Sequence, residues 1–233
     1  MKAFVLAAGL GTRMRDATRT TPKCLLPVAG KPLLGRWFDL LARAGVRQAL
    51  VNTHHLAEAV RDFVAASAPP VDVTLVHEPT LLGSAGTLRE NRGFVRGEEQ
   101  FLVVYADNAS TVDLRTLTAA HLPGDAATLG LFRVPDPQAK GIVELDAEGR
   151  IMSFTEKPEQ PKSDLAWAGI LVGTPALLEA IPDRTPCDLG HDVLPRLVGR
   201  SRGVLIEGYH QDVGTPESYE RACADLGRVG SAA

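Results

Sequence analysis

The sequence predicts an α/β fold of the Rossmann-like class, with a mainly parallel mixed sheet and helices on both faces. Three observations indicate this class. Apolar, strand-like runs alternate with helix-like segments through the first half of the chain. The run at residues 101–106 is apolar throughout, as expected of a central parallel strand. The second half carries shorter alternating runs, which predict a small antiparallel element beside the parallel sheet.

The elements of the first half can be placed in order. Residues 4–8 predict a buried strand that opens into a glycine-bearing loop. Pro32 suits the first turn of a helix, and apolar residues recur at helical spacing from there until Gly45. Further strands are predicted at 48–52, 71–76 and 101–106, and further helices at 56–66 and 87–91.

The second half begins with Asp113, which suits the N-cap of a helix over residues 114–121. Thr215 and Pro216 predict the start of a final helix, and we expect residues 227–233 to form a disordered tail. Antiparallel strands are predicted at 127–133, 142–145 and 151–154, another strand around 168–170, and a short helix over 175–181.

Composition excludes several classes of protein. The chain has 233 residues, enough for one large α/β domain, and we place a single domain over residues 1–226. A net charge of −3 gives no broad surface for nucleic acid or an anionic membrane. The three cysteines are widely spaced and fit no disulfide framework or zinc site. The N-terminal apolar run is too short for a signal-peptide core or a membrane span. We therefore expect a cytoplasmic protein without a nucleic-acid or membrane partner.

The loop after the first strand carries a phosphate-binding pattern. Gly9 and Gly11 leave backbone amides that can face a polyanion without obstruction by side chains, and the cations Arg13, Arg15 and Lys23 follow. No helix is predicted between this loop and Pro32, and loops of this length are usually functional. The dinucleotide fingerprint is incomplete because Met14 stands at its third glycine, and the Walker spacing is also absent.

Two strings in this region resemble a known signature. Residues 6–14, Leu-Ala-Ala-Gly-Leu-Gly-Thr-Arg-Met, and residues 22–28, Pro-Lys-Cys-Leu-Leu-Pro-Val, together resemble the sugar-1-phosphate nucleotidylyltransferases. The segments at 82–88, 155–158 and 212–216 resemble that family's second glycine motif, sugar-phosphate motif and terminal Asp-x-Gly-Thr-Pro motif. The resemblance implies a nucleotide-binding half at about 1–107 and a sugar-phosphate-binding half at 108–226.

The resemblance also implies where the nucleotide lies. Arg13 suits the departing pyrophosphate, and Lys23 suits the α-phosphate. The Glu78 carboxylate could accept from the neighbouring N–H donors of guanine, which would favour GTP over UTP or TTP. The expected nucleotide-binding residues are Leu6, Ala7, Ala8, Gly9, Gly11, Thr12, Arg13, Lys23, Glu78, Gly83 and Ser84.

Two acids are candidates for a metal site. Asp107 directly follows the strand at 101–106, and ligands of doubly wound sheets bind at the carboxyl ends of strands. Asp212 precedes the final helix and has no local capping role to explain it. We expect both to hold one Mg²⁺ between the two substrates and, with Arg13 and Lys23, to form the catalytic set.

The remaining motif implies the sugar side of the site. In this family the acid of the motif at 155–158 meets sugar hydroxyls and its lysine meets the phosphate. Trp167 stands where a small polar residue is expected, which leaves the sugar open. The expected sugar-phosphate-binding residues are Asn108, Gly141, Glu156, Lys157 and Gly169.

The resemblance favours an enzyme whose partners are a nucleoside triphosphate and a sugar 1-phosphate. The overall similarity, including residues 51–56, is greatest to mannose- or heptose-1-phosphate guanylyltransferases, with uridylyl- or thymidylyltransfer to N-acetylmuramate 1-phosphate or glucose 1-phosphate as the alternative. A non-catalytic nucleotide-sugar-binding subunit would be expected to lose part of the catalytic set, which is complete here. A nicotinamide-dependent oxidoreductase is opposed by the missing third glycine. A homodimer is left open.

Overall fold

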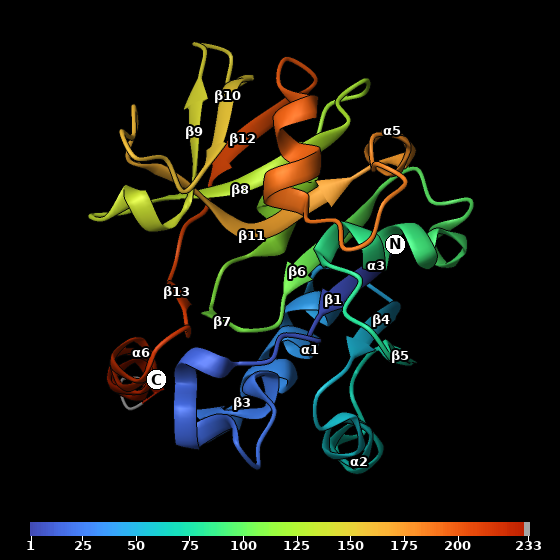
Figure 1. Cartoon of the computed structure of the whole chain (residues 1–233), viewed down its shortest axis with the longest axis vertical. Helices are drawn as coiled ribbons and strands as arrows, with labels where there is room; N and C mark the ends of the chain where they lie inside the picture. Colours follow the sequence, from blue (N-terminus) through green and yellow to red (C-terminus); the bar gives the residue numbers. More distant parts are fainter. Residues whose placement is uncertain (231–233) are drawn as a thin grey trace.

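Within residues 1–230, the part of the chain that the computed structural model describes, a nine-stranded mixed sheet runs through the fold (Figure 1). The side chains at positions 15, 16, 229 and 230 lie outside the described part. The main strand order is β10-β9-β11-β6-β1-β4-β5, and β8 pairs with both β11 and β12. The strands are β1 (Lys2–Leu6), β4 (Gln48–Thr53), β5 (Asp72–His77), β6 (Phe101–Tyr105), β8 (Ala127–Arg133), β9 (Gly141–Leu145), β10 (Ile151–Glu156), β11 (Leu165–Gly173) and β12 (Ser201–Leu205).

The inner strands of the parallel part of the sheet, β1, β4 and β6, are buried on both faces. Strands β1, β4, β5 and β6 are mutually parallel, with β1 between β4 and β6. Phe4 and Val103 lie in one apolar cluster, whereas their neighbours Val5 and Val104 lie in another, and all four side chains are fully buried. Because successive strand residues point to opposite faces, a continuously apolar strand fills two cores at once.

Helices cover both faces, as the sequence predicts. Apolar side chains of α1, α2 and α4 belong to the cluster that contains Val5, and those of α3 and α5 belong to the cluster that contains Phe4. Trp37 of α1 is fully buried in the first of these clusters, so its predicted core position is confirmed. The helices are α1 (Leu33–Arg43), α2 (Ala57–Ser67), α3 (Ser84–Glu90), α4 (Leu114–Ala119) and α5 (Pro175–Glu179).

The predicted antiparallel element is continuous with the parallel sheet. Strand β11 pairs antiparallel with β8 along one edge and with β6 and β9 along the other, and β9 and β10 form a hairpin. Figure 1 shows β9, β10 and β12 at the opposite end of the molecule from α2. The Rossmann-like class with an antiparallel extension is therefore confirmed.

Two helix starts differ from the prediction. Pro32 is the N-cap of α1 and not its first residue. Helix α3 begins at Ser84 and not at Thr87, because the amides of Ala85 and Gly86 both donate to the carbonyl of Cys187. A distant segment therefore completes the first turn of α3. Asp113 caps α4 as predicted, accepting a hydrogen bond from the Arg115 amide.

The C-terminal helix α6 (Pro216–Gly230) corrects the predicted tail. The helix continues through residues 227–230, while residues 231–233 lie outside the described part. Ala222 and Leu226 of α6 are buried in a third apolar cluster with Met14 of the N-terminal loop, which anchors the helix. Figure 1 shows α6 beside the N-terminal hairpin of β2 (Pro27–Val28) and β3 (Lys31–Pro32).

A short ribbon was not predicted. Strand β7 (Asn108–Ser110) pairs antiparallel with β13 (His210–Asp212), and each has only three residues. The ribbon joins the segment after β6 to the segment before α6. No helix among the described residues has both the length and the apolar character needed to cross a membrane.

Candidate active site

A cavity of about 440 Å³ lies where the parallel strands β1, β4 and β6 end. This is the edge of the sheet at which ligands bind in doubly wound folds. All predicted site residues except Gly11 and Thr12 line it. The predicted residues in the lining are Leu6, Ala7, Ala8, Gly9, Arg13, Lys23, Glu78, Gly83, Ser84, Asp107, Asn108, Gly141, Glu156, Lys157, Gly169 and Asp212.

Gly11 and Thr12 shape the loop without lining the cavity. Gly11 has a positive φ of 64°, and its carbonyl accepts hydrogen bonds from the Met14 amide and the Thr18 hydroxyl. Thr12 is exposed and begins the 3-10 turn Thr12–Thr18. The Arg15 side chain lies outside the described part.

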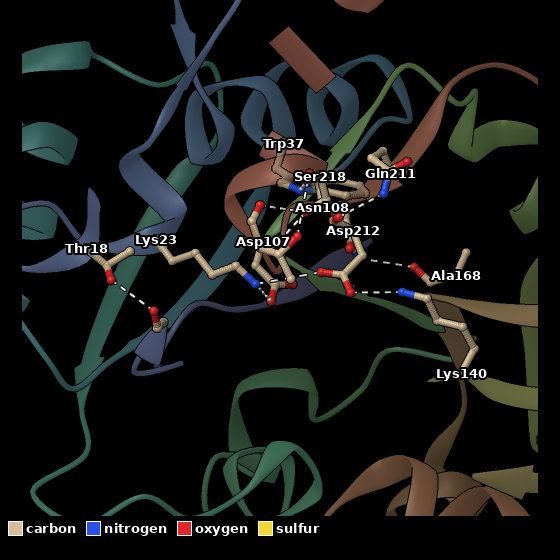
Figure 2. Close-up of polar contacts among 12 residues, drawn as sticks. Thr18, Lys23, Trp37, Asp107, Asn108, Lys140, Ala168, Gln211, Asp212 and Ser218 are labelled. Atoms are coloured by element: carbon tan, nitrogen blue, oxygen red, sulfur yellow. Dashed lines mark hydrogen bonds and ion pairs between the residues drawn. The ribbon is translucent and has the colours of Figure 1, made fainter. Parts of the chain in front are cut away.

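The centre of the cavity is a chain of alternating charges. Lys23 Nζ lies 2.6 Å from Asp107 Oδ2 and 3.7 Å from Asp212 Oδ1. Lys140 Nζ lies 2.9 Å from Asp212 Oδ2. Figure 2 shows the two lysines approaching Asp212 from opposite sides. The two acids predicted from distant parts of the sequence therefore meet at one point.

The ribbon of β7 and β13 explains why the acids meet. In its register Asp212 lies opposite Asn108, the residue after Asp107, and the Val213 amide donates to the Asp107 carbonyl over 3.1 Å. The Asn108 carbonyl in turn accepts from the indole of Trp37, which fixes the ribbon to α1. Three residues of strand thus set the position of the second acid.

Asp212 is held in its charged form. Burial alone would raise the pKa of its carboxyl, but the Lys140 and Lys23 ammonium groups outweigh burial and hold the pKa below its usual value. The Arg13 guanidinium adds to this effect. A Cβ atom on Gly214 would lie 3.1 Å from Arg13 Nη2 and 3.2 Å from Asp212 Oδ1, so only glycine fits beside this pair without a shift.

The two acids fit a magnesium ion that arrives with phosphate. Among the described residues, no group of three or more His, Cys, Asp or Glu is placed to hold a metal. Mg²⁺ is commonly bound by one or two carboxylates together with waters and substrate phosphates, so two acids are sufficient. The side chains of Asp107 and Asp212 are 40% and 30% exposed, which leaves their oxygens accessible.

Glu78 has a different setting from the one predicted. Its side chain is 2% exposed, and Oε1 accepts hydrogen bonds from Asn52 Nδ2 and the Thr87 hydroxyl. Its Oε2 accepts from the Leu82 amide. Asn52 Oδ1 accepts from the Ala7 amide over 2.7 Å. Glu78 therefore ties the start of the first loop to the second glycine motif, and this bonding does not support the prediction that it reads a guanine edge.

The second glycine motif is packed against a distant segment. Gly83 has a φ of 79°, and a Cβ atom there would lie 2.3 Å from the Cys187 carbonyl oxygen. The Ser84 hydroxyl donates to Asp188 Oδ2 over 2.8 Å, while Asp188 Oδ1 accepts from the amides of Gly190 and His191. Asp188 thus starts the turn at residues 189–193, and it also fixes Ser84.

The sugar side of the cavity lies on the β9–β10 hairpin and β11. Gly141 is paired with Glu156, and a Cβ atom on Gly141 would lie 2.7 Å from Glu156 Oε2. Gly169 has a φ of 68° and packs against the ring of Tyr105. Burial raises the pKa of the Glu156 carboxyl, while Lys157 opposes that rise.

Several residues in the lining had no sequence signal of their own. Lys140 was not singled out because one lysine before a glycine carries no pattern. His210 is a ribbon residue, and burial lowers the pKa of its imidazole to about 4, so the ring is neutral at pH 7. The unpredicted lining residues are Cys24, Asn52, Leu81, Tyr105, Phe132, Ala139, Lys140, Trp167, Ala168, Asp188, Gly190 and His210.

Comparison with known proteins identifies the family. The nucleotidyl transferase family model matches residues 2–228, almost the whole chain and every residue of the cavity lining. The chain belongs to the nucleotidyl transferase family. The resemblance inferred from the glycine loop, the Pro-Lys string and the terminal motif is therefore confirmed.

Relatives of this nucleotidyl transferase family member differ in their named substrates. This chain is 34% identical over 232 residues to mannose-1-phosphate guanylyltransferase of Mycobacterium tuberculosis, covering 97% of this chain and 64% of that protein. It is 34% identical over 226 residues to glucose-1-phosphate thymidylyltransferase of Streptomyces griseus, covering 92% of this chain and 62% of that protein. The chain thus spans less than two thirds of the length of these relatives.

A solved structure has the same fold. UDP-glucose pyrophosphorylase in complex with UDP-glucose superposes with a TM-score of 0.83 at 22% identity, covering 97% of this chain and 98% of that chain. At this identity the likeness concerns the fold alone.

Proposed function

We propose that this chain catalyses the Mg²⁺-dependent transfer of a nucleoside monophosphate from a nucleoside triphosphate to a sugar 1-phosphate, with release of pyrophosphate. One observation carries the proposal. Asp107 and Asp212, from distant parts of the sequence, meet at Lys23 inside the cavity formed by the phosphate-loop residues. The family membership and the complete set of Arg13, Lys23, Asp107 and Asp212 support an enzyme over a non-catalytic subunit.

The reaction needs charge stabilisation more than proton transfer. A phosphate monoester has a second pKa of about 6, so the sugar 1-phosphate is mostly dianionic at neutral pH and attacks without a general base. Its oxygen attacks the α-phosphorus, the bond from that phosphorus to the bridging oxygen breaks, and pyrophosphate leaves with the electron pair. The difficulty is that two anions must meet in line while charge grows on the leaving group.

The charges in the cavity suit this task. Lys23 is only 8% exposed, and its ammonium group lies between the two acids. There it would contact the α-phosphate of the bound nucleotide. Arg13 lies on the same loop and offers a planar fork to the pyrophosphate. Asp107 and Asp212 would hold the magnesium ion, which, when bound, neutralises phosphate oxygens and so lowers their mutual repulsion. Lys157 and Glu156 would meet the phosphate and hydroxyls of the sugar.

We propose GTP and a mannose- or heptose-like sugar 1-phosphate as the substrates. The support is the similarity of residues 51–56 to guanylyltransferases and the Mycobacterium tuberculosis relative. Thymidylyl- or uridylyltransfer to another sugar 1-phosphate is the alternative, favoured by the Streptomyces griseus relative at the same identity.

The test is pyrophosphate release measured over a matrix of GTP, UTP, TTP and ATP against mannose, heptose, glucose and N-acetylmuramate 1-phosphates with Mg²⁺. We expect the Asp107→Asn variant to lose roughly 100-fold or more in turnover, since it removes one of the two carboxylates that would hold the magnesium ion. Asp62→Asn, an exposed position on α2, is the matched control and should keep wild-type turnover.

Circular dichroism of the same proteins separates a chemical defect from unfolding. Preserved turnover in a folded Asp107→Asn variant would refute the metal assignment. If none of the substrate pairs releases pyrophosphate while calorimetry still detects nucleotide binding, the non-catalytic subunit would be favoured.

A further inference from the structure

Lys140 faces Lys157 across the open end of the β9–β10 hairpin. The last pair in the hairpin register is Gly141 with Glu156, and the Lys157 amide donates to the Lys140 carbonyl over 2.9 Å. The two lysines are therefore the next cross-strand pair. Like charges directly opposite each other on a hairpin are unfavourable, so this arrangement needs an anion nearby.

The backbone of Lys157 is unusual at the same point. Its φ is 48°, in the left-handed region that non-glycine residues seldom adopt. Such outliers persist where the surrounding structure enforces them, and they concentrate at ligand sites. Lys157 lines the cavity together with Lys140, so the unusual backbone lies in the wall of the site.

Lys140 also contacts the central acid from the sugar side. Its Nζ lies 2.9 Å from Asp212 Oδ2, whereas Lys23 Nζ lies 3.7 Å from Asp212 Oδ1 (Figure 2). Lys23 belongs to the nucleotide loop and Lys140 to the sugar-side hairpin. Each half of the fold thus sends one ammonium group to the same carboxylate, at the place where the two substrate phosphates have to meet.

We propose that Lys140 is a second phosphate-binding lysine, which acts with Lys157 on the phosphate of the sugar 1-phosphate. The inference rests on the proposed function and extends it by one residue. In the structure without substrate, Asp212 is the anion that Lys140 contacts. When the sugar 1-phosphate binds, its dianionic phosphate takes that place between Lys140 and Lys157.

The partial exposure of Lys140 and Asp212 and the flexible side chain of lysine allow this exchange. The side chains of Lys140 and Asp212 are 27% and 30% exposed, so neither is locked into a dry ion pair. A lysine has a flexible stem and three donors, and it can reach a phosphate oxygen while it stays near its carboxylate. A purely structural role for Lys140, as a counter-ion of Asp212, would instead affect both substrates alike.

The experiment compares Lys140→Met with Lys140→Arg and with the control Lys162→Met, an exposed lysine that is not part of the cavity lining. For Lys140→Met we expect KM for the sugar 1-phosphate to rise about 10- to 100-fold, the usual effect of losing a charged hydrogen bond. KM for the nucleoside triphosphate should stay within about twofold of wild type. Lys140→Arg should recover most of the loss, and Lys162→Met should behave as wild type.

Calorimetric titration with mannose 1-phosphate and with glucose 1-phosphate, without nucleotide or Mg²⁺, gives a second readout. Lys140→Met should weaken binding of the sugar phosphate by a similar factor. An unchanged KM and affinity for the sugar phosphate, or equal losses for both substrates, would overturn the proposal.

The titration also separates the two hypotheses. If the wild type binds a sugar 1-phosphate and releases no pyrophosphate, the proposed function fails, and the Lys140→Met affinity alone decides the role of Lys140. If the wild type binds neither sugar phosphate, the result counts against both the proposed function and the proposed role of Lys140.

Discussion

At the scale of single residues, burial decides what a charged side chain can do. Glu78 was predicted to read a base because a carboxylate can accept from the neighbouring N–H donors of guanine. The structure gives both of its oxygens internal donors, from Asn52, Thr87 and Leu82. Asp107, which like Glu78 follows a strand, and Asp212 instead remain partly exposed in the cavity. The distinction depends on side-chain contacts that no local pattern reports.

This difference predicts the behaviour of Glu78→Gln. The amide keeps one oxygen and turns its N–H donors either toward the Leu82 amide or toward the donors of Asn52 and Thr87, so we expect the free energy of unfolding to fall by about 1–3 kcal/mol. The ratio of kcat/KM for GTP over UTP should stay unchanged, because the carboxylate is occupied within the protein. Urea unfolding and steady-state kinetics measure the two effects, with the exposed Glu99→Gln as control. A changed GTP/UTP ratio in folded Glu78→Gln would restore its base-reading role.

At the scale of elements, periodicity predicted most strands and helices correctly. The apolar runs that became β1, β4, β5 and β6 are long enough for their burial pattern to be visible. The ribbon of β7 and β13 was missed because three-residue strands are too short to show an alternating pattern. The start of α3 was placed too late because its first amides bond to Cys187, which lies far away in sequence.

The site was predictable for a related reason. Its phosphate loop and motifs are contiguous strings, so Arg13, Lys23 and Asp107 could be assigned from neighbours in the sequence. Lys140 belongs to no such string and enters the cavity only through the pairing of strands. The sequence therefore predicts residues that form motifs, and it misses single residues that reach the cavity through tertiary contacts.

The contact between α3 and the Cys187 segment predicts an asymmetry between two glycines. Gly83 and Gly97 have nearly the same φ, 79° and 84°, but only Gly83 has backbone atoms within 4 Å of an added Cβ. Gly97→Ala should cost about 1–2 kcal/mol of unfolding free energy from the left-handed backbone alone. Gly83→Ala should cost roughly 1–3 kcal/mol more, because the Cys187 backbone has to move. Thermal and urea unfolding of the two variants test this, and equal losses would mean that the contact is easily displaced.

At the scale of the whole molecule, each of the three apolar clusters contains or borders one thiol. Cys24 and Cys187 are buried at 1% exposure, Cys223 of α6 is only partly buried, and all three are free. This agrees with the prediction of no disulfide framework. Burial raises the pKa of the Cys24 thiol to about 12, which keeps it protonated and unreactive at neutral pH.

Homodimer formation stays a prediction, for analytical ultracentrifugation to test.

Iodoacetamide labelling of the native protein should therefore modify Cys223 first, with Cys24 and Cys187 protected until the protein unfolds. Mass spectrometry of tryptic peptides, before and after addition of guanidinium, measures the three sites separately. A reducing agent should leave the melting temperature unchanged, since no disulfide is present among these cysteines. Rapid labelling of Cys24 in the native protein would show that the segment containing Lys23 and Cys24 opens readily.

The place of Asp212 on the late ribbon strand has a consequence for biosynthesis. A chain emerging from a ribosome exposes its glycine loop and Asp107 before its C-terminal segments. The partner acid leaves the ribosome only when most of the sheet has already been made. A translation product that stops before β13 would therefore have most of a nucleotide pocket but lack the second carboxylate, and such a fragment should sequester nucleotide without consuming it.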